Sequence, residues 1–397
     1  MTARTERFHD IDGMRGLLMV LGVFFHSALI YQAGSFHDQF IVILQDISWS
    51  PVWDWPILFS NVMRMPCFFI ISGFLMGLAL AKRPVGSVLG KRLVRIVVPL
   101  VTAAVLLVPM QGWVLHLAGG GSGWPWTPYL SSGQPYDPYS YSASVSYLWF
   151  LINLAVYMTL ISLWWALARR FPQSWRAIFD GPWLTGPVGW LAMAAIIIAC
   201  RVADRAVTAQ AIIQFAPFFF IGVWLSLDVE RYRSYSTFTW WRVVLAVGVF
   251  LAFGALAMSG DLPAWQRLLK RGLEAVAAVG LSSQVLGVGR WLFSRPMPAL
   301  RRLSDASYTI YLLHQPLVLW LAWQLRGQTW HPLIKFVIVS FAVTVATYYC
   351  HRFIVNRLPM LTVLLNGRVP RSSPQSPAAA APDQPPGAAV ALSESGR

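Results

Sequence analysis

About ten long apolar stretches divide this chain, and they constrain its fold more than any other feature. Each has about 16 to 25 residues, the length that an α-helix needs to cross the hydrocarbon core of a bilayer. Backbone polar groups in lipid must be paired within their own segment, so such stretches fold as helices. The stretches lie near residues 14–33, 57–81, 94–117, 147–168, 183–200, 212–227, 240–258, 273–293, 308–325 and 333–354.

The composition excludes a soluble protein of this length, because 56% of the residues are apolar and only 12% are charged. We therefore predict an all-α integral membrane protein with about ten transmembrane helices. Residues 1–360 are expected to form the membrane domain, and residues 361–397 a cytoplasmic tail. The tail is rich in Pro, Ala and Ser, which predicts disorder at least from residue 371.

The distribution of positive charge predicts the orientation. Most of the 31 Lys and Arg residues fall on the side of the N-terminus, and the loops 34–56 and 118–146 on the other side contain none. Short cytoplasmic loops hold the excess of positive charge, so both termini are expected in the cytoplasm. The net charge of +15 reflects this bias and attraction to anionic lipid, and it does not indicate a nucleic-acid partner.

The first apolar stretch carries Arg15 and His26. Eleven residues turn a helix by about 1100°, which is about 20° past three turns, so both side chains share a face about 16 Å apart. Asp12 lies one turn before Arg15 and starts the same polar stripe. Ionisable groups at this depth usually mark a polar pathway or a reaction site. The alternative is that His26 is a neutral histidine bonded to a neighbouring helix.

The second stretch carries Arg64 about two turns from the non-cytoplasmic side, followed by Pro66 and Ser72-Gly73. An arginine at that depth needs a partner or a wet cavity, and Pro66 removes a helix hydrogen bond nearby. We therefore predict a kinked, polar-lined site, with Glu274 at similar depth as the partner of Arg64. The alternative is a buried ion pair that only fixes helix packing.

Two arginines start the third stretch. Arg92 and Arg95 are three residues apart, so their guanidinium groups share a helix face and could close on one phosphate. Such a pair suits a phosphorylated cofactor. The alternative is that both residues anchor the helix at the cytoplasmic surface.

The ninth stretch places Tyr308, Tyr311 and His314 at i, i+3 and i+6. The two tyrosines share a face, whereas His314 is turned by about 240° from Tyr308, so an ideal helix does not aim all three at one point. A kink near Pro316 is the alternative that would change this geometry. Tyrosines near a helix entry also form interfacial belts, which makes this motif weak when it is taken alone.

The long loop 118–146 has no basic residue and carries Trp124, Trp126 and Tyr129 among Gly, Pro and Ser. Flat rings with polar edges can stack on sugar rings while hydroxyl groups make hydrogen bonds. A carbohydrate contact is therefore one interpretation of this loop. A loop at the membrane interface is the other.

The motifs are more specific as an ordered set: Arg15 and His26 with ten residues between them, FFIISGFL at 68–75, RLVR at 92–95, LWFL at 148–151 and SYTIYLLHQPL at 307–317. With these motifs in this order, the chain resembles the acyltransferase-3 family over roughly residues 8–360. These multi-helix enzymes move acyl groups from cytoplasmic acyl-CoA to extracytoplasmic carbohydrates. The resemblance implies succinyl-CoA or acetyl-CoA as the donor substrate and no bound cofactor or metal. It further implies a periplasmic or cell-surface glycan as acceptor, an osmoregulated periplasmic glucan above all, at the bacterial inner membrane.

The resemblance also implies roles for individual residues. His26 would be the catalytic histidine, either as general base or as transient acyl acceptor, with Asp12 and Arg15 on its face. Arg15, Arg92 and Arg95 would hold the phosphates of the donor. The remaining candidates would line the site or bind the acceptor: Arg64, Ser72, Glu274, Tyr308 and His314 for the first role, and Trp124, Trp126, Tyr129 and Trp149 for the second.

Two other function classes compete with acyl transfer. A transporter or flippase of a glycan or lipid-linked precursor should show two related halves, and residues 1–200 and 201–354 show no convincing repeat. A membrane scaffold without chemistry does not need His26 and Arg64 at depth. The sequence therefore favours an enzyme.

Overall fold

The structure is a computed structural model that describes residues 9–33, 44–124, 146–168, 185–207, 212–295 and 297–368. Every regular element within these ranges is helical, and each of the ten apolar stretches contributes to one of the helices. Within the described residues, eight helices are long and apolar enough to cross a membrane, against the predicted number of about ten. The predicted class, an all-helical multi-pass membrane protein, is therefore confirmed.

The long helices are α1 (His9–Ala28), α2 (Asp54–Lys82), α3 (Val85–Thr102), α4 (Val108–Ala118), α7 (Trp149–Ala168), α8 (Pro187–Val207), α9 (Ile212–Ser226), α11 (Trp240–Ala257), α12 (Ala264–Leu292), α13 (Pro298–Leu325) and α14 (Pro332–Cys350). The short elements are η1 (Pro51–Trp53), η2 (Ala103–Leu107), η3 (Ser146–Leu148), α10 (Val229–Tyr235), η6 (His351–Val355) and α15 (Pro359–Asn366). The turn η2 joins α3 and α4 into one continuous span.

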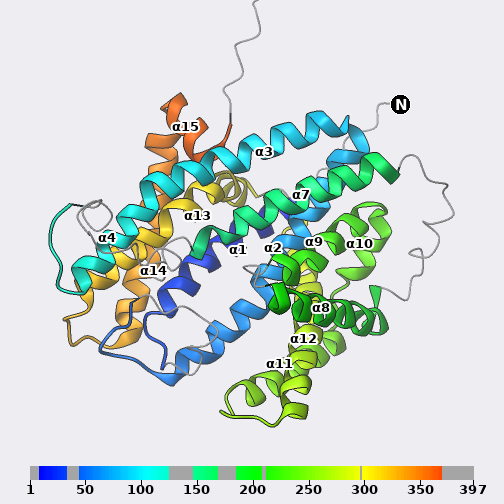
Figure 1. Ribbon diagram of the computed structural model, residues 1–397, viewed down its shortest axis with the longest axis horizontal. Helices are drawn as coiled ribbons and strands as arrows, with labels where there is room; N and C mark the ends of the chain where they lie inside the picture. The colour runs from blue at the N-terminus through cyan, green and yellow to red at the C-terminus, as the bar shows by residue number, and fades with distance from the viewer. Residues whose placement is uncertain are drawn as a thin grey trace, which may run out of the picture.

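Helix α1 lies in the middle of the bundle, in contact with α2, α12, α13 and α14 (Figure 1). Its most extensive contact is with α13. The two backbones approach closely because α1 has a glycine at the contact: a Cβ atom on Gly16 would lie 3.0 Å from the backbone nitrogen of Ser304. This packing sets the polar stripe of α1 against α13.

Helices α2 and α9 cross with their backbones in contact. A Cβ atom on Gly73 would lie 1.9 Å from the carbonyl oxygen of Phe219, and one on Gly222 would lie 2.0 Å from that of Ile70. Only residues without a side chain fit such a crossing. Gly73 therefore serves the packing of α2 against α9, and α2 runs unbroken through Pro66.

The outward faces of the outer helices are apolar. Large exposed hydrophobic side chains lie on α3, α7, α8, α11 and α14, among them Val101, Leu163, Leu191, Val244 and Phe341. In a bundle that spans a membrane, such faces contact lipid and need no protein partner. The candidate site lies where α1 meets α13, which instead carries a run of buried polar side chains: Ser304, Ser307, Thr309, His314 and Gln315.

The folded chain extends past residue 360, the boundary expected from the sequence. Helix α15 begins at Pro359 and packs against α3 and α13, and Arg368 still contacts α13. The apolar run of α15 is short, so it gives no transmembrane signal, but it covers the ends of two longer helices. The expected disorder from residue 371 falls outside the described residues.

A buried ion pair joins the start of α14 to the segment before η1. The Lys335 ammonium lies 2.8 Å from the Asp46 carboxylate, and both side chains are fully buried. We expect Lys335→Met to lower the free energy of unfolding by about 3 kcal/mol, because it leaves a buried carboxylate without its partner. Thermal unfolding in detergent measures this loss. The double variant with Asp46→Asn should regain part of it, and an unchanged midpoint for the single variant contradicts the prediction.

Candidate functional site

Three helices bring His26, His314 and Arg64 together inside the bundle. The imidazole rings of His26 on α1 and His314 on α13 have centroids 5.1 Å apart. The Arg64 guanidinium comes from α2 and interacts electrostatically with both rings. His314 and Arg64 are buried, whereas His26 is only half-buried and keeps part of its surface accessible. Residue spacing did not predict that the two histidines are neighbours.

The hydrogen bonds of His314 assign its tautomer. Its Nδ1 atom lies 2.6 Å from the carbonyl oxygen of Tyr311 and 3.2 Å from that of Ile310. A carbonyl oxygen only accepts, so Nδ1 carries the hydrogen and donates it. The Nε2 atom then has a free lone pair, and it is buried without a hydrogen-bond partner among the described residues. His314 therefore presents a proton acceptor beside His26.

The predicted pairing of Arg64 with Glu274 is wrong. Glu274 pairs with Arg201 on α8 at 2.7 Å. Equal depth in the membrane does not determine which neighbour a helix face meets, and this face of α12 meets α8. The Arg64 guanidinium instead lies 4.4 Å from the centroid of the Phe25 ring, in the space left by the missing side chain of Gly22.

Tyr308, Tyr311 and His314 form a row of neighbouring rings along α13. The ring centroids of Tyr308 and Tyr311 are 6.4 Å apart, and those of Tyr311 and His314 are 6.0 Å apart. As the spacing predicted, the three rings do not meet at one point. The three rings follow one another along α13, and His314, the last of them, lies beside His26.

Two hydrogen bonds from tyrosine hydroxyl groups fix the position of Tyr311, the middle ring of this row. The Tyr311 hydroxyl donates to the carbonyl oxygen of Tyr147, which belongs to the turn before α7. The Tyr147 hydroxyl donates in return to the carbonyl oxygen of Leu312 at 3.4 Å. Pro316 has no N–H group and leaves that carbonyl without its usual helix partner. Pro316 thus leaves the Leu312 carbonyl oxygen available to accept from Tyr147, and this hydrogen bond connects α13 to the segment that starts α7.

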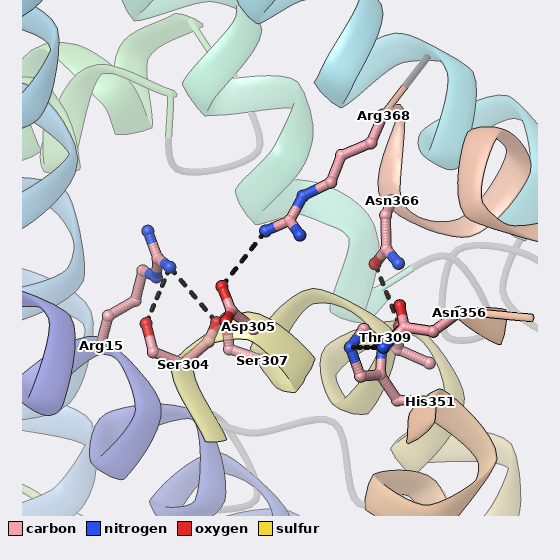
Figure 2. Close-up of polar contacts among 9 residues, drawn as sticks. All are labelled: Arg15, Ser304, Asp305, Ser307, Thr309, His351, Asn356, Asn366 and Arg368. Atoms are coloured by element: carbon pink, nitrogen blue, oxygen red, sulfur yellow. Dashed lines mark hydrogen bonds and ion pairs between the residues drawn. The ribbon is translucent and has the colours of Figure 1, made fainter. Parts of the chain in front are cut away.

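Arg15 is held at the opposite end of the polar stripe. Its Nη2 atom donates to the hydroxyl oxygen of Ser304 at 2.7 Å and to the carbonyl oxygen of Ser304 at 3.2 Å (Figure 2). The Ser307 hydroxyl donates to the same carbonyl oxygen at 2.7 Å. Asp12 is half-buried one turn earlier and interacts electrostatically with Arg15. These contacts fix Arg15 near the start of α13.

The two arginines of α3 lie at this same end. Arg92 donates to the carbonyl oxygen of Leu75 at 3.4 Å, three residues beyond Ser72 on α2. Arg95 is half-buried and interacts electrostatically with Arg15, Arg92 and the Tyr308 hydroxyl. The structure therefore gathers the predicted phosphate-binding arginines, although α1 and α3 are far apart in the sequence.

The aromatic candidates for acceptor binding are only partly described. Trp126 and Tyr129 lie outside the described residues, and Trp124 is exposed. Trp149 starts α7, and its ring stacks on Phe215 with centroids 5.1 Å apart. One face of Trp149 is thus already covered by the aromatic core, which leaves less of it for a sugar than the sequence suggested.

Arg368 is a residue of this region that sequence reasoning missed. Its guanidinium reaches from the end of α15 to Asp305 on α13, with 3.6 Å between Nη2 and Oδ1 (Figure 2). The available signal was the stretch PMLTVLLNGR, an apolar helical run that ends in Gly-Arg. No group of three His, Cys, Asp or Glu side chains with the geometry of a metal site occurs in the described part of the chain.

The profile of a family described as an acyltransferase domain matches residues 8–352 of this sequence. The chain is also similar to glucans biosynthesis protein C of Salmonella gallinarum, at 25% identity over 387 residues. The protein of the same name in Salmonella agona is 25% identical over 384 residues. In both cases the match covers 92% of this chain and 96% of the relative. No solved structure matches the chain significantly.

Proposed function

We propose, on the premise that this chain belongs to the acyltransferase family whose profile spans residues 8–352, that it transfers an acyl group from cytoplasmic acyl-CoA to hydroxyl groups of an extracytoplasmic glycan. The acyl group is succinyl or acetyl, and the acceptor is an osmoregulated periplasmic glucan. The names of the similar proteins support a glucan acceptor. The enzyme works in the bacterial inner membrane with both termini in the cytoplasm, an orientation that rests on the charge bias alone.

The observation that carries this proposal is the separation of two polar clusters along α1. Arg15 lies with Arg95 at one end, and His26 lies with His314 and Arg64 at the other. The two ends are about 16 Å apart along the helix. An extended pantetheine arm spans a distance of this order. A donor whose phosphates bind the arginines would therefore place its thioester at His26.

The reaction needs one base and one group that stabilises negative charge. The acceptor hydroxyl oxygen attacks the thioester carbonyl carbon while His26 takes the hydroxyl proton. The bond between carbonyl carbon and sulfur then breaks, and the sulfur of CoA takes the proton. Arg64 lies beside the imidazoles, where a guanidinium stabilises the negative carbonyl oxygen of the intermediate. His314 lies beside His26 with its Nε2 lone pair unpaired among the described residues, so it offers a second proton acceptor at the same point.

Glycan analysis tests this function directly. Mass spectrometry of periplasmic and surface glycans should show acyl esters in cells that make this protein and none in cells that lack it. The mass of the ester identifies the acyl group. Unchanged acylation of all glycans in the deletion strain would exclude the proposed activity.

The arginines of α3 are predicted to bind the donor. Replacing both Arg92 and Arg95 by Ala should weaken acyl-CoA binding by about 2 to 4 kcal/mol, the scale of two charge-assisted contacts. Calorimetric titration of the purified protein measures the change. The matched control is the double replacement of Arg301 and Arg302, which are exposed at the start of α13. Equal affinity in the two double variants would assign Arg92 and Arg95 to membrane anchoring only.

A further inference from the structure

The segment that follows α15 adds a fourth arginine to the group formed by Arg15, Arg92 and Arg95. Arg368 interacts electrostatically with both Arg15 and Arg95, and its ion pair with Asp305 is long at 3.6 Å. The side chains of this pair are 41% and 51% exposed, so the pair itself contributes little to stability. Arg368 is thus free to exchange Asp305 for a stronger anion.

A buried hydrogen-bond network fixes the end of α15. The Thr309 hydroxyl donates to Asn366 Oδ1 at 3.0 Å, and His351 Nδ1 lies 2.8 Å from the Thr309 oxygen (Figure 2). Because the one hydroxyl hydrogen is used on Asn366, His351 Nδ1 must be the donor to Thr309. His351 Nε2 then accepts from Asn356 Nδ2 at 3.2 Å. These hydrogen bonds link Asn366 at the end of α15 to Thr309 on α13 and to His351, and so fix the position of α15.

The turn after α15 sets Arg368 beside α3. Gly367 has a φ of 57°, in the left-handed region that favours glycine. A Cβ atom on Gly367 would lie 2.4 Å from the Cα atom of Arg95. The turn therefore rests on the backbone of α3 at one of the predicted phosphate-binding residues. This contact places the guanidinium of the next residue at the same end of the bundle.

The charges in this region are unbalanced without a ligand. Arg15 and Arg95 repel each other and each repels Arg92 and Arg368. The carboxylates that interact with this group are Asp12 and Asp305. Two buried donors, Arg15 Nε and Asn366 Nδ2, have no hydrogen-bond partner within the described ranges. Arginine forks and spare N–H donors are the groups that bind phosphates. The arrangement fits an anion with several charges better than one with a single charge.

We infer that Arg368, held by α15, completes a polyanion site that selects a donor with several phosphates over a donor with one. The inference rests on the proposed function and specifies its donor. CoA carries a diphosphate and a 3′-phosphate, whereas phosphopantetheine carries one phosphate, which Arg92 and Arg95 suffice to hold. Arg368 is thus a specificity-determining residue that excludes acyl groups carried on phosphopantetheine alone.

Binding of three probes to the purified full-length protein in nanodiscs tests this inference. The probes are CoA, 3′-dephospho-CoA and phosphopantetheine, and the variants are Arg368→Ala, Asp305→Asn and the control Arg357→Ala at an exposed site. We expect Arg368→Ala to weaken CoA binding about tenfold, the loss of one charge-assisted contact, and to change phosphopantetheine binding by less than about threefold. Asp305→Asn removes the competing carboxylate and should leave CoA affinity unchanged or raise it. Arg357→Ala should behave as wild type.

The outcomes separate this inference from the proposed function. If wild type binds CoA and Arg368→Ala binds it equally well, Arg368 takes no part in donor selection and only this inference fails. If Arg368→Ala loses affinity for CoA and for phosphopantetheine by the same factor, the inference is also contradicted. A purely structural ion pair predicts that Arg368→Ala and Asp305→Asn lower the melting temperature alike without changing the ratio of affinities. If wild type binds none of the probes, the acyl-CoA donor of the proposed function fails as well.

Discussion

His26→Ala is expected to abolish glycan acylation while the protein remains folded in the membrane. His26 is the half-buried histidine of the cluster with His314 and Arg64, whereas His314 beside it is buried, so His26 is the imidazole that an acceptor hydroxyl can reach. Loss of a positioned general base lowers a rate by about 10²- to 10⁴-fold.

Acylation by membranes of the variant, measured by mass spectrometry of the glycan product, tests the role of His26. The matched control is His116→Ala, which removes an exposed histidine on α4 and should leave the rate unchanged. CoA binding by His26→Ala should also be unchanged, because the arginine cluster lies about 16 Å away along α1. An acylation rate near that of wild type contradicts the proposed mechanism.

His26 acts as a base in the proposed mechanism, so the donor alone should leave no acyl group on the protein. Intact mass measurement after incubation with acyl-CoA, without a glycan, should show the unmodified mass. An acyl group found on His26 in this experiment would contradict direct transfer and show that the reaction proceeds through an acyl-histidine intermediate. The sequence left these two routes open, and this measurement decides between them.

Gly222→Leu is expected to prevent the bundle from folding. A Cβ atom at this position would lie 2.0 Å from the carbonyl oxygen of Ile70 and 2.8 Å from the backbone nitrogen of Phe74, so the clash is with backbone and no side chain can move aside. Overpacking of a core usually costs about 1 to 3 kcal/mol, and separation of two helix backbones costs more. The contact between α2 and α9 would be lost, and with it the position of Arg64 on α2.

The yield of monodisperse protein after detergent extraction, with its thermal unfolding midpoint, measures this effect. Gly248→Leu makes the same substitution on α11 at an exposed position, where a Cβ atom meets nothing within 4 Å. It should fold as well as wild type, because the added side chain enters lipid. Equal yields and midpoints for the two variants would show that α2 and α9 do not cross as described.

The sequence by itself determined the fold class and the two ends of the candidate site. Apolar length predicted the helices, because a bilayer permits few other ways to pair the backbone. Helical periodicity placed Arg15 and His26 on one face of α1, and it predicted that His314 is turned away from the face that Tyr308 and Tyr311 share. All of these are local properties of a single helix, so residue spacing is enough to derive them.

Only the tertiary structure decided which helices meet. Equal depth made Glu274 the expected partner of Arg64, but α12 turns that carboxylate to Arg201 on α8, and Arg64 faces the two histidines instead. The pairing of His26 with His314 depends on the packing of α1 against α13, which Gly16 permits and no periodicity encodes. Arg368 joins the arginine group because α15 folds back onto α3. Contacts between distant segments depend on the packing of whole helix surfaces, and residue spacing within one helix carries no information about them.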